Sequence, residues 1–165
     1  MDRRTVIAGL AVLGVPMTAR ADETRVAQDG THLVLWHAEG RLHAQFSAPT
    51  MGWVAVGFNN VEQLKGTRFV IGAMRPDGFH AEEHIAVVPD HPTVQSLGLV
   101  PGLGDLSGRV APNRTTMTFS LPHVFPDSEN PRLGPDATTY LMLAWSHDKD
   151  FAHHSAWRRH TLVTL

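Results

Sequence analysis

The sequence predicts an all-β fold, an antiparallel β-sandwich of about eight to nine or more strands. Three observations favour this class. Short segments alternate apolar and polar side chains with a period of two, and connections rich in glycine and proline separate them. No segment of useful length has the 3.6-residue period of an amphipathic helix. The chain also contains no cysteine, so we expect a hydrophobic core without disulfide bonds.

Five strands are predicted in the first half of the domain. Residues 31–37 and 41–47 alternate around an Ala-Glu-Gly turn, which is typical of a hairpin. Residues 53–58 (WVAVGF) form a short apolar strand. Residues 68–74 and 79–88 flank a Pro-Asp-Gly sequence that has the residues a tight turn requires, so we expect them to pair.

The second half begins with a predicted long loop. Residues 89–113 contain four prolines and many polar breaks, which favour a loop with at most one short helical turn. Residues 114–121 (RTTMTFSL) alternate cleanly and predict a strand. Residues 138–145 and 161–165 are expected to be the last two strands.

The N-terminal segment, residues 1–21, is predicted to be an export signal. Two arginines, Arg3 and Arg4, precede an apolar stretch at 6–15 and a small-residue cleavage site, which is the layout of a bacterial signal peptide. The arginine pair followed by Thr-Val-Ile resembles a twin-arginine (Tat) signal. We therefore expect a single mature domain, residues 22–165, in the periplasm or outside the cell.

The composition of the mature part excludes several function classes. It has 11 basic and 15 acidic residues, a net charge of −4 with histidine neutral, which disfavours nucleic acid as a partner. The lack of cysteine excludes thiolate metal sites and cysteine nucleophiles. No second apolar stretch is long enough to span a membrane. No nucleophile elbow, phosphate-binding loop or zinc-protease helix occurs, so we predict a binding or redox module and not an enzyme.

The segment from residue 140 to the C-terminus contains the candidate site. It places His147, His153 and His154 on a loop after a predicted strand, followed by Trp157 and a pair of arginines. Imidazoles bind metals, guanidinium groups bind carboxylates, and an indole provides a flat apolar wall. The arginines are Arg158 and Arg159.

A second set of histidines supports an alternative. His80, Glu82 and His84 alternate along one predicted strand and should share one face of the sheet. Two imidazoles and a carboxylate on one face have the chemistry of a zinc or copper site. His80 and His84 are therefore alternative metal ligands.

Several motifs, in their order along residues 25–165, resemble the DOMON domain family (dopamine β-monooxygenase N-terminal-like). The matching segments are GWVAVGFN at 52–59, KGTRFVIG at 65–72, the PDG turn with EEH at 82–84, TFSLP at 118–122, AW at 144–145 and DFAHHS at 150–155, followed by Arg158. The resemblance implies an immunoglobulin-like β-sandwich that binds a b-type haem or a sugar at one end. In haem-binding relatives, such as the cytochrome domain of cellobiose dehydrogenase, a Met and a His from two loops ligate the iron.

Mapped onto this sequence, the resemblance makes His154 the iron ligand, with His153 as the adjacent alternative. Arg158 or Arg159 would pair with a haem propionate, and Trp157 would pack on the porphyrin edge.

The chain departs from the family pattern at Leu64, where the resemblance expects the methionine ligand. Leucine has no lone pair to donate. The neighbouring Lys65, in its neutral form, and the thioether of Met51 are the remaining partner ligands within reach of a loop. Three possibilities stay open: haem held by one side chain, haem held by a histidine and an atypical partner, or no haem.

The leading hypothesis is an exported b-type haem-binding module for electron transfer. Its partner would be a membrane b-type cytochrome or a periplasmic oxidoreductase. One alternative is a haem-free module for a carbohydrate or another small ligand. The other is a histidine-based metal-binding protein that uses His80 and His84 or the loop at 147–154.

Overall fold

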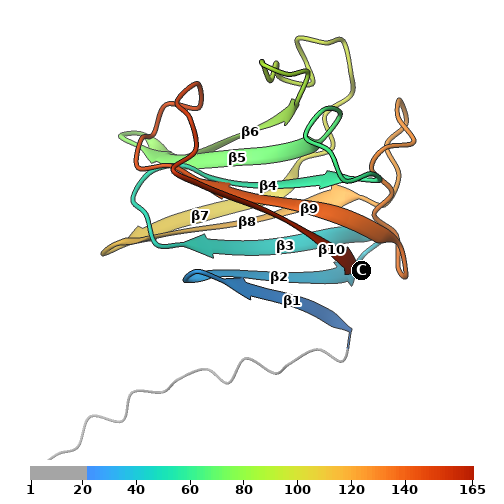
Figure 1. Cartoon of the computed structure of the whole chain (residues 1–165), viewed down its shortest axis with the longest axis horizontal. Helices are drawn as coiled ribbons and strands as arrows, with labels where there is room; N and C mark the ends of the chain where they lie inside the picture. The colour runs from blue at the N-terminus through green and yellow to red at the C-terminus, as the bar shows by residue number, and fades with distance from the viewer. Residues whose placement is uncertain (1–21) are drawn as a thin grey trace, which may run out of the picture.

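The computed structural model describes residues 22–165; the predicted export signal, residues 1–21, lies outside the described part. Residues 22–165 form ten strands in two antiparallel five-stranded sheets that pack face to face (Figure 1). This confirms the predicted all-β sandwich. Within the same residues, no helix is long and apolar enough to cross a membrane.

The first sheet has the order β1-β2-β3-β8-β7. Its strands are β1 (Glu23–Gln28), β2 (Thr31–Ala38), β3 (Arg41–Ala48), β8 (Arg114–Pro122) and β7 (Gly104–Ala111). The predicted hairpin is present as β2 and β3, with Leu33 opposite Phe46 in the register.

The second sheet has the order β10-β9-β4-β5-β6 and contains the candidate site. Its strands are β10 (Trp157–Thr164), β9 (Thr138–Trp145), β4 (Val54–Asn59), β5 (Arg68–Arg75) and β6 (Gly78–Ile85). β5 and β6 pair across the Pro-Asp-Gly turn as predicted.

The structure corrects three predictions about elements. β1 was not predicted, and β7 occupies part of the segment expected to be a loop, residues 89–113. Both are edge strands in which no residue is fully buried, so they lack a clear apolar alternation and form by pairing with β2 and β8. β10 begins at Trp157 and not at residue 161, so the Trp-Arg-Arg sequence lies on a strand and not on a loop.

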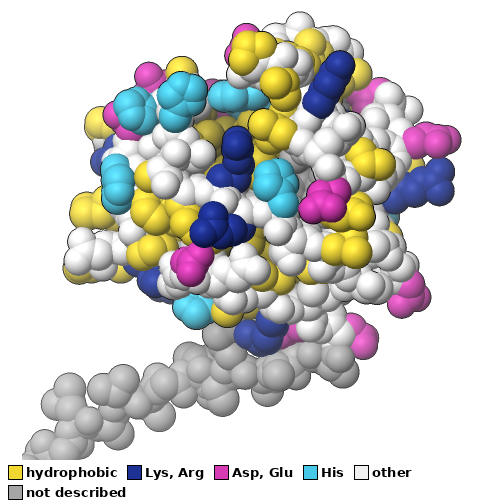
Figure 2. Space-filling view, in the orientation of Figure 1, with side chains coloured by type: hydrophobic (Ala, Val, Ile, Leu, Met, Phe, Trp, Pro, Cys, Tyr) yellow, Lys and Arg dark blue, Asp and Glu magenta, His cyan; other side chains and the backbone are white. Residues whose placement is uncertain are grey.

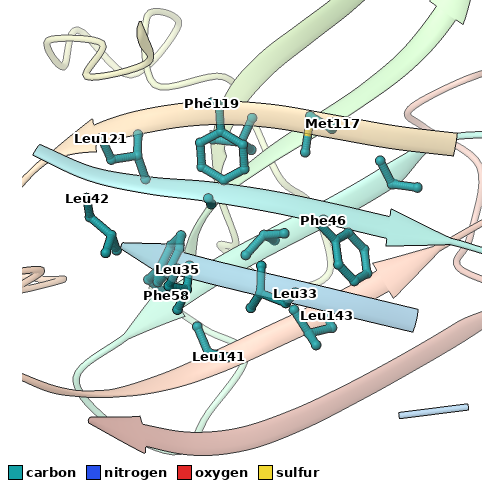
Figure 3. Close-up of a cluster of buried hydrophobic side chains, with 14 of the residues drawn as sticks. Leu33, Leu35, Leu42, Phe46, Phe58, Met117, Phe119, Leu121, Leu141 and Leu143 are labelled. Atoms are coloured by element: carbon teal, nitrogen blue, oxygen red, sulfur yellow. The ribbon is translucent and has the colours of Figure 1, made fainter. Parts of the chain in front are cut away.

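The main core lies between the two sheets (Figure 3). Alternate residues of β2, β3 and β8 point inward, among them Leu33, Phe46 and Phe119, which are at most 1 % exposed. They pack against Phe58 of β4 and Leu141 of β9. The alternation of apolar and polar residues that predicted these strands therefore matches the alternation of buried and exposed side chains in the structure.

A buried ion pair holds one end of the second sheet. Arg68 of β5 has no exposed surface, and its guanidinium donates to the carboxylate of Glu83 on β6 and to the carbonyl oxygen of Val100. The same carboxylate accepts the backbone N–H groups of Gly102 and Leu103 at 2.7 and 3.0 Å. These contacts fasten the long β6–β7 connection to the sheet.

We expect Glu83→Gln to destabilise the fold by about 3 kcal/mol, because the buried charge of Arg68 would then be paired only with Asp127, at 3.4 Å. Glu82→Gln is the matched control: Glu82 is the neighbouring residue, its side chain is 51 % exposed, and its loss should cost less than about 1 kcal/mol. Urea unfolding of both variants measures the difference. Equal unfolding free energies would contradict the structural role of Glu83.

Candidate functional site

A second group of buried apolar residues lies on the outer face of the second sheet. It includes Trp53, Phe69, Met142 and Phe151, each 5 or 6 % exposed, and Leu64 packs against it. The outer face of an antiparallel sheet is usually polar and solvated. Here the central strands are buried on both faces, so other segments of the chain must cover the outer face of the sheet.

Three connections cover this face. The β4–β5 connection (60–67) and the start of the β6–β7 connection (86–103) leave from the end of the sheet where Phe58, Arg68 and Ile85 align. The β9–β10 connection (146–156) leaves from the opposite end, where Trp145 pairs with Val54. Figure 1 shows these loops at opposite ends of the second sheet.

The strand register places small side chains at the centre of the covered face. Arg158, Ala144, Ala55, Ile71 and Glu82 form one row across the five strands, because each is the register partner of the next. Alanine at the two central positions leaves a depression in the sheet surface. A basic side chain stands at the β10 edge of this row and an acidic one at the β6 edge.

The next row on the same face begins with His160 on β10 and continues through Met142, Gly57 and Phe69 to His84 on β6. Glycine again occupies the central strand. Burial, and then the charge of Arg158, hold the pKa of His160 below its ordinary value.

The depression and its covering loops enclose a cavity of about 270 Å³. Its floor is apolar and comes from β4, β5 and β9, while the polar side chains lie on the loops and on β10. Figure 2 shows histidine side chains gathered at the upper left, with hydrophobic and basic side chains beside them. The polar lining side chains are those of Asp90, His91, His153, His154, Ser155 and Arg158.

The site lies on the broad face of a sheet, between loops from both ends. The resemblance implied one end of the sandwich, whereas this cavity lies on the outer face of the second sheet. The physical reason is that the apolar outer face of β4, β5 and β9 spans the middle of the sheet, so the covering loops must reach over it from either side.

The β9–β10 loop is attached to the start of β4. The backbone N–H of Trp53 donates to the carbonyl oxygen of Asp148 at 2.8 Å, and the N–H of Ser146 donates to the carbonyl oxygen of Trp53 at 3.0 Å. Gly52 makes this approach possible, because a Cβ there would lie 2.2 Å from the carbonyl oxygen of Ser146. Phe151 then inserts into the apolar cluster and holds the middle of the loop against the sheet.

The two adjacent histidines of this loop are not equivalent. The Nδ1 atom of His153 lies 3.8 Å from a carboxylate oxygen of Asp148. The N–H of Asp150, and then the charge of His153, lower the pKa of Asp148, so this carboxylate is ionised. The imidazole of His154 has no hydrogen-bond partner among residues 22–165, and it lines the cavity. Both rings line the cavity, but His153 has the contact with Asp148 and His154 has none in the described residues.

Trp157, Arg158 and Arg159 follow at the start of β10, where successive side chains point to opposite faces of the sheet. Arg158 lines the cavity, and no carboxylate in the described part of the chain pairs with it. Arg159 points to the opposite side, 3.7 Å from Asp29, and the indole N–H of Trp157 donates to the same carboxylate at 3.0 Å. Trp157, expected at a porphyrin edge, packs against the main core and does not line the cavity.

The structure places the expected partner ligands differently. Leu64 lines the cavity, in the place where the resemblance expects a methionine. Lys65 is exposed and does not line the cavity. Met51 is 52 % exposed and also lies outside the lining. Neither Lys65 nor Met51 is positioned to share a ligand with His154.

The alternative histidines share one face of β6, as predicted, but their rings are engaged. His80 lies 2.9 Å from Asp77, and His84 is hydrogen-bonded to Glu82 and to the carbonyl oxygen of His91. Across residues 22–165, no three His, Cys, Asp or Glu side chains are arranged to hold a metal ion. The geometry therefore gives no support to a metal site at His80 and His84.

Sequence reasoning missed three residues of the site. The residues are His91, Trp53 and Met142, none of which was among the candidate site residues predicted from the sequence. All three line the cavity. The indole nitrogen of Trp53 is also buried with no hydrogen-bond partner. The one available signal was that residues 53–58 are apolar without alternation, which indicates a strand buried on both faces.

We expect Gly52→Ala to displace the β9–β10 loop and to destabilise the protein by roughly 1–3 kcal/mol, the usual cost of overpacking. Hydrogen exchange of residues 146–156 and urea unfolding measure the two effects. Gly134→Ala is the control, because a Cβ there meets no atom within 4 Å. Unchanged exchange in the Gly52 variant would show that this close approach does not hold the loop.

The comparisons with known proteins agree with this fold. No family model and no curated protein sequence matches the chain. The cytochrome b domain of pyranose dehydrogenase from Coprinopsis cinerea superposes with a TM-score of 0.62 at 11 % identity, over 86 % of this chain and 81 % of that one. The cytochrome domain of Myriococcum thermophilum cellobiose dehydrogenase gives 0.56 at 8 % identity, over 87 % and 81 %. The chain therefore has the β-sandwich fold of these cytochrome domains.

Proposed function

We propose that the chain is an exported haem-binding module for electron transfer, and that a b-type haem occupies the cavity on the second sheet. The observation that carries the proposal is the free imidazole of His154 at a cavity with an apolar floor, in a fold shared with two cytochrome domains. A neutral imidazole is a common axial ligand of haem iron. Bound there, haem would supply the one-electron redox chemistry.

The residues present fit such a group. The floor is apolar, and alanines at its centre leave room for the edge of a flat molecule. The buried indole N–H of Trp53 and the guanidinium of Arg158 have no acceptors of their own in the described residues. A ligand with an apolar body and peripheral carboxylates matches both properties, and haem has this composition.

Each residue has a definite part in this proposal. His154 would bind the iron, and His153 would be held away by Asp148. Arg158 would pair with a propionate, while Arg159 and Trp157 belong to the contact with Asp29. Phe69, Met142 and Phe151 would exclude water. A membrane b-type cytochrome or a periplasmic oxidoreductase would be the redox partner.

Leu64 gives the proposed site a distinctive property. Leu64 favours a module in which one protein side chain holds the iron, because leucine offers no lone pair and His91, the lining histidine from the same end of the sheet, is in contact with His84 through its Nδ1. We expect the ferric protein to change its spectrum when imidazole is added, since a small ligand would then complete the coordination.

We expect the purified mature chain to bind hemin with a Soret band, and His154→Ala to weaken hemin binding by more than about tenfold. Loss of a hydrogen-bond partner of a metal-ligating residue lowers metal affinity roughly 10–100-fold. Loss of the ligating imidazole itself should lower the affinity for hemin at least as much. Absorption titration with hemin measures the affinity. His153→Ala and His32→Ala are the controls; His32 is exposed on β2, in the other sheet.

A chain that binds no hemin would overturn the proposed function. If His153→Ala, and not His154→Ala, removed the band, the assignment of the ligand would be wrong and the function would stand.

We also propose that residues 1–21 direct export by the twin-arginine route. Replacing both Arg3 and Arg4 with lysine should keep the protein in the cytoplasm, because this pathway recognises the arginine pair and not charge alone. Fractionation of a bacterial host that expresses the full chain measures this. Export of the double variant at the normal level would contradict the twin-arginine route.

A further inference from the structure

Two side chains that line the cavity are obligate hydrogen-bond donors without a partner in the described residues. Trp53 contributes a buried N–H without a partner, and Arg158 contributes a guanidinium without a carboxylate partner in residues 22–165. One lining carboxylate is present, that of Asp90, and its oxygen accepts the backbone N–H of His91 at 2.8 Å. A ligand of this cavity must therefore bring acceptors with it.

His91 stands on the flank of the cavity opposite Arg158. Arg158 lies on β10, one edge of the sheet, and His91 lies on the connection that follows β6, the other edge. The ring of His91 packs edge-on against Phe69, with centroids 5.6 Å apart, and against His84, at 5.1 Å. These two contacts hold the ring in place.

The contact with His84 determines which nitrogen of His91 carries the proton. Nδ1 of His84 is hydrogen-bonded to the backbone carbonyl oxygen of His91, which can only accept, so this Nδ1 carries a hydrogen. The same Nδ1 lies 3.2 Å from Nδ1 of His91. Because it faces a donor, Nδ1 of His91 is the acceptor nitrogen of its ring. The proton of neutral His91 is therefore on Nε2.

Glu82 reinforces this arrangement from the solvent side. Its carboxylate lies 3.0 Å from Nε2 of His84, whose side chain is 7 % exposed. Both nitrogens of His84 thus face oxygen atoms, and these two contacts fix the orientation of its ring. The series Glu82–His84–His91 leads from solvent to the cavity and leaves the Nε2–H of His91 with no partner in the described part of the chain.

We propose that His91 is a second carboxylate-binding residue of this cavity: its Nε2–H donates to a carboxylate of the bound ligand, on the flank opposite Arg158. Glu82 and His84 are positioning residues that hold the required tautomer. The inference rests on the proposed function, in which the carboxylates are the haem propionates. It also removes His91 from the candidates for iron ligation, because a protonated Nε2 has no lone pair to donate.

Protoporphyrin IX and its dimethyl ester test this directly. They differ in the charge of the two side-chain carboxylates, and neither contains iron, so iron ligation cannot contribute. Porphyrin fluorescence measures binding to the mature chain. We expect the free acid to bind more tightly than the ester, and His91→Ala to weaken the free acid about tenfold, the low end for a hydrogen bond to a charged group, with little effect on the ester.

Three further variants separate a donor role from a packing role. His91→Gln keeps an N–H donor and should retain most of the preference for the free acid. Glu82→Gln should lose part of the preference for the free acid, because the ring of His84 is then held less firmly. Asp90→Asn should raise the affinity for the free acid more than for the ester, since it removes the one carboxylate of the cavity lining. His32→Ala, in the other sheet, should change neither affinity.

The possible results distinguish the two proposals. If His91→Ala weakens the acid and the ester equally, or weakens neither, the carboxylate role of His91 is wrong, while hemin binding through His154 stands. If the wild-type chain binds neither porphyrin nor hemin, both proposals are overturned. A loss confined to the free acid and restored by His91→Gln supports His91 as the donor.

Discussion

The buried pair of Arg68 and Glu83 is the interaction on which the site depends. A fully buried guanidinium is tolerated only when its charge and its N–H groups are matched. Here the carboxylates of Glu83 and Asp127, a backbone carbonyl and the ring of Phe125, 3.6 Å away, do this. Glu83 also accepts two backbone N–H groups of the β6–β7 connection. The pair therefore fixes the far end of the loop whose first residues include His91.

The second constraint is the double burial of the central strands. β4 and β5 have apolar residues on both faces, so the sandwich contains one core between its sheets and a smaller apolar layer outside them. Loops from both ends cover this layer incompletely because Ala55 and Ala144 are too small to fill the space. The cavity is the result, and the polar side chains at its rim belong to the covering loops and to the edge strand β10.

The predictions from sequence succeeded where burial follows a simple period. The hairpin of β2 and β3 and the alternation of β8 were visible because one face of each strand packs in the core. β1 and β7 were missed because edge strands with polar side chains have no such period. The start of β10 was missed because Arg158 and Arg159 resemble a solvated loop. Their strand conformation comes from pairing with β9.

By itself, the sequence determined the fold class, the histidine loop near the C-terminus and the departure at Leu64, since each is a property of residue type and spacing. Only the tertiary structure decided which residues meet. It separated His154 from His153 through Asp148, placed Arg158 and Arg159 on opposite faces, and brought His91 to the cavity beside His84. The reason is that strand register and loop attachment set these distances, and neither is encoded in the local pattern around any of these residues.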